Sequence, residues 1–277
     1  MAAPSPAVTA EPGAMAVLLR EDDSDGIAVL TLNQPQARNA LSEAMLAALT
    51  RDIAAIAASS AVRALVLTAN GPAFCAGHDL KEVTVHRADP DGGRAYVTRV
   101  METCSALMQA IIAMPQPVIA AVEGMATAAG CQLVATCDLA VASRSAGFCT
   151  PGVNIGLFCT TPMVALSRNV APKHALEMLL TGEAVSAADA QRIGLVNRVV
   201  APGAARGAAL AIACQIASKS SMTVALGKRA FYTQRGMDVA AAYRYASGVM
   251  VENMLKFDAK EGIGAFLEKR DPRWEDR

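Results

Sequence analysis

The chain has 277 residues, of which 53% are apolar and 4% aromatic, and its 25 basic and 25 acidic residues cancel to a formal net charge of zero. This composition indicates a large core of aliphatic side chains and argues against disorder. A balanced charge gives no reason to expect a nucleic acid or an anionic membrane as partner. Charges or prolines interrupt every apolar stretch before the roughly 20 residues that a membrane span needs.

The seven cysteines are odd in number and form no C-x-x-C pair. They predict free thiols in a reducing compartment. Residues 1–14 are rich in Ala and Pro, lack Lys and Arg, and resemble neither a secretory signal nor a transit peptide. We therefore expect a loose N-terminal tail and a cytoplasmic protein.

In the first half of the chain the hydrophobic pattern alternates between strands and helices. Ser42 is a plausible N-cap for a helix whose apolar residues recur at helical spacing up to Ile56. Strands that alternate with helices imply crossover connections and a mostly parallel sheet. The expected elements are a hairpin formed by residues 15–19 and 26–32, buried strands at 63–69, 118–122 and 139–142, and a helix at about 92–114.

From about residue 162 onward the pattern is nearly all helical, with a short strand-like run at 196–200. The chain shows no internal repeat and no linker that would separate independent domains. We therefore predict an α/β core over residues 15–200 and a helical subdomain over residues 201–277, both built on one core.

Two small-residue segments follow buried strands. Residues 71–80 (GPAFCAGHDL) follow the strand at 63–69, and residues 123–133 (EGMATAAGCQL) follow the strand at 118–122 and open a helix. Ligands bind at this end of parallel strands, and the free N–H groups of a helix N-terminus favour negative charge. Two converging turns of this kind could each supply one N–H to an oxyanion, although small residues also serve simply to let helix and strand pack closely.

Several common catalytic signatures are absent. The sequence has no G-x-G-x-x-G after a strand, no phosphate-binding G-x-x-x-x-G-K-[ST], no H-E-x-x-H and no G-x-S-x-G. Its three histidines do not allow a histidine-rich metal site. We expect no bound metal and no separate cofactor.

Together these segments resemble the crotonase (enoyl-CoA hydratase/isomerase) superfamily. This resemblance implies a spiral of ββα units with a C-terminal helical trimerisation subdomain, and an acyl-CoA thioester as substrate. The motifs that carry it run in order from the hairpin to the C-terminus: residues 32–41 (LNQPQARNAL), 74–80 (FCAGHDL), 117–124 (PVIAAVEG), 130–133 (GCQL), 137–138 (CD), 180–183 (LTGE), 194–196 (GLV) and 261–270 (EGIGAFLEKR).

By this resemblance the backbone N–H groups of His78 and Ala129 would form an oxyanion hole for the thioester oxygen. Coenzyme A would enter as part of the substrate. Phe266 and Lys269 would reach the CoA of a neighbouring subunit, since the resemblance implies a homotrimer or a dimer of trimers. The remaining residues at CoA-contacting positions are Gln36, Ala37, Arg38, Ala76, Asp79 and Leu80.

The two catalytic glutamates of the hydratases would map to Gln132 and Gly152, and neither position is acidic here. Gln132 can hydrogen-bond a water molecule but cannot accept its proton, and Gly152 has no side chain. The aspartate of some double-bond isomerases maps near Thr160, which is not acidic either. Hydration by the two-glutamate mechanism is therefore not expected.

Three functions stay open at this stage. The first is an acyl-CoA-processing enzyme of the hydratase/isomerase family with a non-standard site, similar to an animal subgroup that also lacks both glutamates. The second is a decarboxylase of a malonyl-type CoA thioester, because methylmalonyl-CoA decarboxylases carry a catalytic histidine at the position of His78, although their tyrosine would map to Cys159. The third is a non-catalytic acyl-CoA binder.

Overall fold

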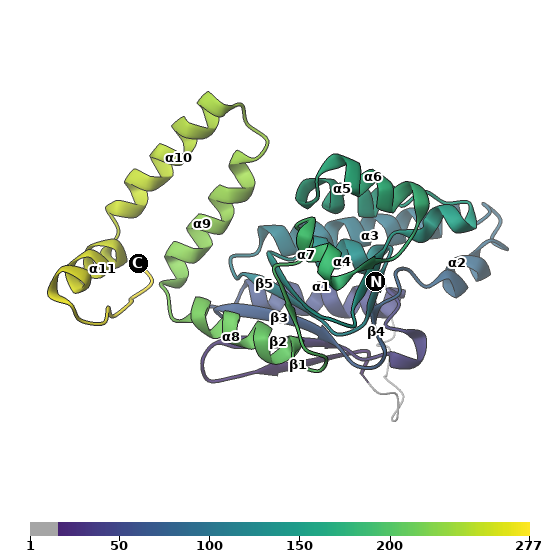
Figure 1. Cartoon of the computed structure of the whole chain (residues 1–277), viewed down its shortest axis with the longest axis horizontal. Coiled ribbons are helices and arrows are strands. Elements are labelled where there is room, and N and C mark those ends of the chain that lie inside the picture. Colours follow the sequence, from purple (N-terminus) through teal and green to yellow (C-terminus); the bar gives the residue numbers. More distant parts are fainter. Residues whose placement is uncertain (1–15) are drawn as a thin grey trace, which may run out of the picture.

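A six-stranded sheet lies at the centre of the computed structural model, which describes residues 16–277 (Figure 1). The predicted tail at residues 1–14 lies outside the described residues. The strand order is β1-β2-β3-β5-β7-β10, and every neighbouring pair is parallel except the β1–β2 hairpin. These strands are β1 (Leu18–Asp22), β2 (Ile27–Leu32), β3 (Ala64–Ala69), β5 (Val118–Val122), β7 (Leu139–Ser143) and β10 (Arg198–Val200).

A second sheet of four short strands runs in the order β4-β6-β8-β9. Each of β3, β5 and β7 is followed directly by one strand of this second sheet, so the chain winds as a spiral of strand, strand and then helix or loop. The predicted crotonase-like ββα spiral is confirmed. The short strands are β4 (Ala73–Cys75), β6 (Met125–Thr127), β8 (Gly147–Cys149) and β9 (Val185–Ser186).

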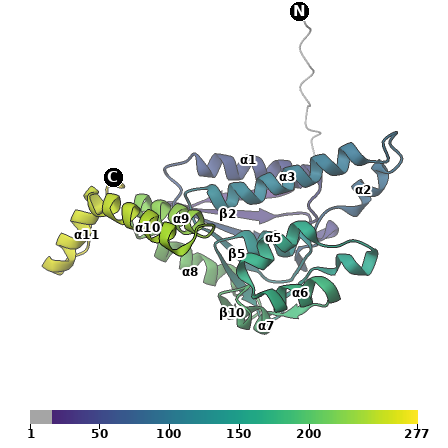
Figure 2. The ribbon, with the colours of Figure 1, turned by 90° about the horizontal axis from the view of Figure 1, so that it is seen from above.

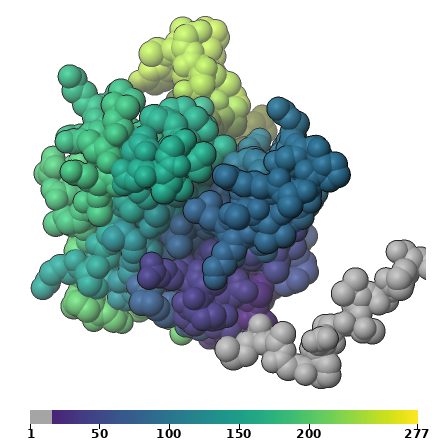
Figure 3. All heavy atoms as spheres, turned by 90° about the vertical axis from the view of Figure 1, so that its right-hand side faces the viewer, coloured from purple at the N-terminus to yellow at the C-terminus, as the bar shows by residue number. Residues whose placement is uncertain are grey.

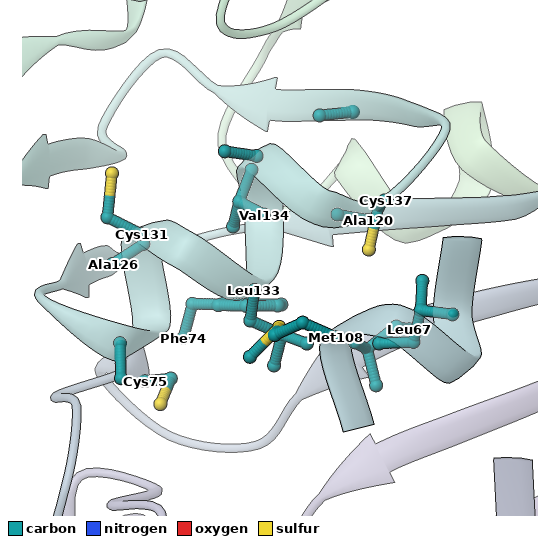
Figure 4. Close-up of a cluster of buried hydrophobic side chains, with 14 of the residues drawn as sticks. Leu67, Phe74, Cys75, Met108, Ala120, Ala126, Cys131, Leu133, Val134 and Cys137 are labelled. Carbon is teal, nitrogen blue, oxygen red and sulfur yellow. The ribbon is translucent and has the colours of Figure 1, made fainter. Parts of the chain in front are cut away.

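Helices cover both faces of the large sheet, which explains its nearly continuous apolar strands. Successive residues of a strand point to opposite faces. Ile27 and Val29 of β2 therefore pack with α8, whereas Ala28 and Leu30 face the larger core that includes α1 and α3. In that core, Phe74, Met108 and Leu133 meet beside α4 (Figure 4).

Eleven α-helices and two short 3₁₀ helices are present in the described residues. Ser42 caps α1 as predicted, since its side chain accepts a hydrogen bond from the Met45 N–H. The helices are α1 (Glu43–Ala57), α2 (Leu80–His86), α3 (Arg94–Ala113), α4 (Ala129–Thr136), α5 (Thr160–Asn169), α6 (Pro172–Thr181), α7 (Ala187–Arg192), α8 (Ala205–Ala217), α9 (Ser221–Gln234), α10 (Val239–Met254), α11 (Phe257–Glu268), η1 (Pro35–Ala37) and η2 (Pro151–Ile155).

The helices after residue 200 divide into two groups. Helix α8 packs against the sheet, whereas α9, α10 and α11 extend away from it as an arm (Figures 1 and 2). No single described helix is long and apolar enough to cross a membrane. Helices α8 and α9 together would be long and apolar enough, but the chain bends by 108° between them.

A largely buried ion pair connects the arm to the core. The Lys228 ammonium on α9 lies 2.7 Å from the Asp138 carboxylate and also donates to the carbonyls of Ile111 and Gln116. Asp138 accepts two further hydrogen bonds, from the Val118 N–H and the Tyr232 hydroxyl. Every charged atom of the pair thus has a partner, which is the condition under which a buried pair is tolerated.

Candidate active site

The loop after β4 meets the N-terminal loop that contains the predicted CoA-contacting residues. The Ala76 N–H donates to the Arg38 carbonyl at 3.0 Å, and the Leu41 N–H donates to the Gly77 carbonyl at 2.7 Å. Leu41 and His78 pair as an isolated parallel bridge. Residues 36–38 and 76–80, which lie far apart in the sequence, therefore come together.

These hydrogen bonds determine where the His78 N–H points. In a trans peptide unit the carbonyl and the following N–H point in opposite directions, and the described residues contain no cis peptide bond. Because the Gly77 carbonyl is directed at Leu41, the His78 N–H is directed away from Leu41. It has no hydrogen-bond partner among residues 16–277.

The Ala129 N–H is fixed in a similar way at the start of α4. Its peptide unit includes the Ala128 carbonyl, which accepts a hydrogen bond from the Gln132 N–H at 2.9 Å and so points along the helix. The Ala129 N–H consequently points out of the helix N-terminus, where backbone donors are free. Ala128 holds this turn in an unusual conformation for a non-glycine residue, with φ 50° and ψ −114°, and its N–H donates to the Cys149 carbonyl at 2.9 Å.

The two turns are in contact. A Cβ atom on Gly77, whose φ is +91°, would lie 3.1 Å from the Ala128 Cβ and 3.3 Å from the Ala129 nitrogen. A Cβ on Gly130 would lie 2.2 Å from the Cys75 carbonyl oxygen, so only glycine allows α4 to approach β4 this closely. The structure therefore brings Gly77, next to His78, into contact with the Ala128–Ala129 turn, so the two loops that carry these N–H groups lie side by side.

The imidazole of His78 is largely buried and unpaired. Neither Nδ1 nor Nε2 has a hydrogen-bond partner. Burial lowers the pKa of the His78 imidazole, and the nearby Leu41 backbone, which lies outside hydrogen-bonding geometry with the ring, raises it by less. The ring is therefore neutral at pH 7, with one nitrogen free to donate and the other free to accept.

The positions of the missing acids also lie at this site. Gln132 is 5% exposed on α4, and its Oε1 has no hydrogen-bond partner. Gly152 is buried in η2, and a Cβ there would lie 2.9 Å from the Cys159 Sγ and 2.9 Å from the Leu157 carbonyl oxygen. The space that an acidic side chain at residue 152 would enter is therefore filled.

Three cysteines lie close to the same turn, and all are buried free thiols. Burial, with smaller contributions from the neighbouring Cys149 and Cys159, raises the pKa of the Cys131 thiol to about 12. Burial also raises the pKa of both of these neighbours. These thiols stay protonated at neutral pH, so they supply neither a nucleophile nor a base.

The other residues predicted to contact CoA divide into two groups. Gln36, Ala37 and Arg38 are exposed, and Arg38 lies beside the 76–80 loop through its hydrogen bond with Ala76. Figure 3 shows one face of the molecule, on which the N-terminal part of the chain (purple), a blue region and a teal to green region lie next to one another. The Asp79 carboxylate caps α2 by accepting from the N–H groups of Lys81 and Glu82. The exposed Phe266 and Lys269 belong to α11 and its C-cap, far from α2 and α4 on the same chain (Figure 1), so their contribution to a neighbouring site stays a prediction.

One residue that supports the site was not assigned a role from the sequence. Asn39 is fully buried with φ 53° and donates to the carbonyls of Asn70 and Ala73 at 2.9 and 2.8 Å. Its Oδ1 accepts from the Gln34 N–H. Asn39 thereby ties the loop that begins at Gln34 to β4. Asparagine tolerates this left-handed conformation better than most residues. An asparagine in this loop was therefore the one feature of the sequence that could have indicated its role.

Comparison with known proteins identifies the family. The family model described as enoyl-CoA hydratase/isomerase matches residues 22–277. The chain belongs to the enoyl-CoA hydratase/isomerase family. The rat enoyl-CoA hydratase domain-containing protein 3, mitochondrial, is 51% identical over 250 residues, covering 90% of this chain and 82% of the rat protein.

Solved structures of this family superpose closely. A crystal structure of an enoyl-CoA hydratase from Mycobacterium smegmatis gives a TM-score of 0.89 at 55% identity and covers 93% of this chain and 98% of that one. The human enoyl-CoA hydratase domain-containing protein 3 gives 0.88 at 47% identity, covering 93% and 100%. The similarity to an animal subgroup that was expected from the sequence is confirmed by these relatives. The names of the curated animal relatives include "mitochondrial", and a cytoplasmic location for this chain stays a prediction.

Proposed function

We propose that the chain binds acyl-CoA thioesters and acts at their α-carbon through an enolate-type oxyanion held by the N–H groups of His78 and Ala129. The observation that carries this proposal is the contact between Gly77 and the Ala128–Ala129 turn. Both peptide units are held by hydrogen bonds to their carbonyls. A preorganised donor of this kind is worth about 2.7–4 kcal/mol of the barrier.

The site does not support two-acid hydration. Water addition needs one group to take a proton from water and one to deliver a proton to carbon. Gln132 is a neutral amide, Gly152 has no side chain, and the adjacent thiols remain protonated. Slow turnover of an enoyl-CoA, or a different reaction of the same oxyanion, fits this site better.

Decarboxylation of a malonyl-type CoA thioester is the second candidate, because the unpaired imidazole of His78 lies at the site. The bond between the α-carbon and the carboxylate breaks, CO₂ leaves, and the electron pair forms the thioester enolate. The α-carbon then takes a proton, which the N–H of the neutral imidazole can supply. This reaction needs no glutamate.

The test offers crotonyl-CoA, a dienoyl-CoA and methylmalonyl-CoA to the purified protein and follows each by mass spectrometry. The Ala129→Pro variant removes one donor N–H at the first position of α4, where proline is best tolerated. We expect it to lower turnover by 10²–10³-fold.

The proposal fails if no thioester binds or reacts, or if Ala129→Pro retains full turnover with unchanged helix content. Conversion of methylmalonyl-CoA alone would favour the decarboxylase, and binding without any conversion would favour the non-catalytic role.

We also propose self-association as a homotrimer or a dimer of trimers through the C-terminal arm. Monomeric proteins seldom leave extended apolar surfaces in water, and sedimentation showing a stable monomer at micromolar concentration would refute this assembly. The large apolar side chains exposed on α10 and α11 include Val239, Met250, Val251, Met254, Ile263, Phe266 and Leu267.

A further inference from the structure

Helix α11 has little packing of its own. Only Asp258 and Ala265 of its 12 residues are buried, and the helix lies at the far end of the arm, away from the two sheets (Figure 1). Its Phe266 side chain is 81% exposed. A helix with so few buried apolar contacts keeps a fixed position only if another segment holds it.

Residues 271–277 hold α11 through its one buried charged side chain. The Asp258 carboxylate, 2% exposed, accepts hydrogen bonds from the N–H groups of Glu275 and Asp276 at 2.8 and 3.0 Å. The Asp258 N–H donates to the Arg277 carbonyl at 3.0 Å. The first turn of α11 and the segment 271–277 are therefore joined by three hydrogen bonds around one residue.

The opposite side of the segment 271–277 is tied to the core. The Trp274 ring packs against α11, and its Nε1–H donates to the Ser218 carbonyl at 2.9 Å. The Asp276 carboxylate accepts from the Ser221 N–H at 2.6 Å and lies 2.8 Å from the Arg63 guanidinium. Arg63 comes just before β3 and also donates to two carbonyls at the corner between α8 and α9. The segment thus fixes α11 relative to the core.

The end of α11 is held in an unusual conformation at Lys269. Its φ is 56°, in the left-handed region where a helix commonly ends with glycine. The next residue, Arg270, donates from both terminal nitrogens to the Glu261 carboxylate, at 2.6 and 2.9 Å. The chain thereby folds back along α11. A lysine kept where glycine is preferred indicates that its side chain has a role.

The side chains that this arrangement presents fit the nucleotide end of CoA. An aromatic ring such as Phe266 can stack on a purine base, and the ammonium of a lysine such as Lys269 binds phosphate. We propose that Asp258 is a positioning residue for CoA binding: through the segment 271–277 it holds Phe266 and Lys269 where they meet the nucleotide of the acyl-CoA bound by a neighbouring subunit. This inference rests on the proposed thioester site and the proposed assembly.

The test compares two ligands by calorimetric titration of the full-length protein. Butyryl-CoA and S-butyryl-pantetheine carry the same thioester, but only the first has the nucleotide. We expect the wild-type protein to bind butyryl-CoA at least about tenfold more tightly, as one hydrogen bond to a charged group predicts. This ratio of affinities measures the contribution of the nucleotide.

Asp258→Asn should reduce the ratio and leave the affinity for S-butyryl-pantetheine unchanged. The variant keeps the size of the side chain, but one of the two N–H groups then faces an amide NH₂, which cannot accept a hydrogen bond. Asp238→Asn is the matched control on the same arm. Asp238 caps α10 by accepting from the Ala241 N–H, and asparagine caps a helix equally well, so the ratio should stay at its wild-type value.

A double substitution tests whether Asp258 acts through Lys269. Lys269→Gln removes the ammonium and should lower the ratio by itself. Adding Asp258→Asn to Lys269→Gln should then have a smaller effect than Asp258→Asn alone, because residues that act through one another are not additive. Trp274→Phe removes the hydrogen bond to the Ser218 carbonyl and keeps an aromatic ring. It should also lower the ratio, and it decides the question if Asp258→Asn does not fold.

Three results would overturn the inference and leave the thioester site standing. They are a wild-type protein that binds both ligands equally, a ratio that survives both Asp258→Asn and Trp274→Phe, and an equal loss of affinity for both ligands in these variants. Sedimentation of the variants provides the second readout, since dissociation of the assembly would show that Asp258 serves association and would equally overturn the inference. If neither ligand binds the wild-type protein, the proposed function fails and this inference fails with it.

Discussion

The Sγ of Cys159 lies 2.9 Å from the position that a Cβ atom on Gly152 would occupy. The Leu157 carbonyl oxygen lies equally near on the backbone. The packing of η2 against the residues that precede α5 therefore leaves no room for an acidic side chain at residue 152. Restoring that acid by a single substitution would require both neighbours to move.

This contact predicts that Gly152→Ala destabilises the protein by about 1–3 kcal/mol through overpacking. Gly207 on α8 has no atom within 4 Å of a Cβ position, so Gly207→Ala should stabilise by about 0.5–1 kcal/mol. Denaturant unfolding of both variants measures the difference. An unchanged midpoint for Gly152→Ala would show that this region is loosely packed.

Gln132→Glu should raise the rate of crotonyl-CoA hydration, because it places a general base at a buried position beside the oxyanion donors. Such a group contributes roughly 10²–10⁴-fold, whereas the wild-type protein should hydrate crotonyl-CoA slowly. The loss of the enoyl-thioester absorbance measures both rates. Fast hydration by the wild-type protein would contradict our interpretation of the site.

His78 predicts how stability depends on pH. Burial lowers the pKa of its imidazole in the folded state, so the unfolded chain binds a proton first as the pH falls below about 6.5. Stability should therefore decrease between pH 6.5 and the lower folded-state pKa, and this contribution should level off below it. Thermal unfolding across this pH range should show a smaller decrease in stability for His78→Phe than for the wild-type protein. Equal dependence of stability on pH in the two proteins would contradict a buried neutral His78 ring.

The Lys228–Asp138 pair predicts a large loss of stability on substitution. Lys228→Met leaves the Asp138 carboxylate buried without its cation, and breaking a buried pair in this way costs about 3–5 kcal/mol. The exposed pair formed by Arg192 and Asp189 is the control, because Arg192→Met should cost no more than about 1 kcal/mol. Chemical denaturation compares the two, and similar losses would show that Lys228 does not anchor the arm.

Much of the fold could be predicted because its long elements have clear periodicity. The Ser42 cap, the strands β3, β5 and β7 and the long α3 were predicted close to their observed bounds. The hairpin was also predicted, but its first strand is Leu18–Asp22 and not residues 15–19, because the polar residues 20–22, expected outside the strand, continue the pairing with β2. The three-residue strands β4, β6 and β8 were not predicted, since three residues are too few to show an alternation. The short α2 was missed as well; its start is marked only by the Asp79 cap.

The candidate site was predictable only in part, since its central groups belong to the backbone. Small residues around Gly77 and Ala129 indicated two turns, but their contact depends on the parallel pairing of β4 with β6, which pattern alone does not reveal. The unpaired ring of His78 and the closeness of Cys159 to Gly152 are tertiary features. Residue spacing in the sequence does not indicate that Cys159 lies beside Gly152 or that the His78 ring lacks a partner.

The most direct test of the central claim is a crystal structure with a non-hydrolysable acyl-CoA analogue that retains the carbonyl oxygen. We predict that this oxygen lies about 2.7–3.1 Å from the backbone nitrogens of both His78 and Ala129, with the analogue passing between α2 and the start of α4. A carbonyl oxygen bound by other groups, or two nitrogens too far apart to share it, would contradict the account.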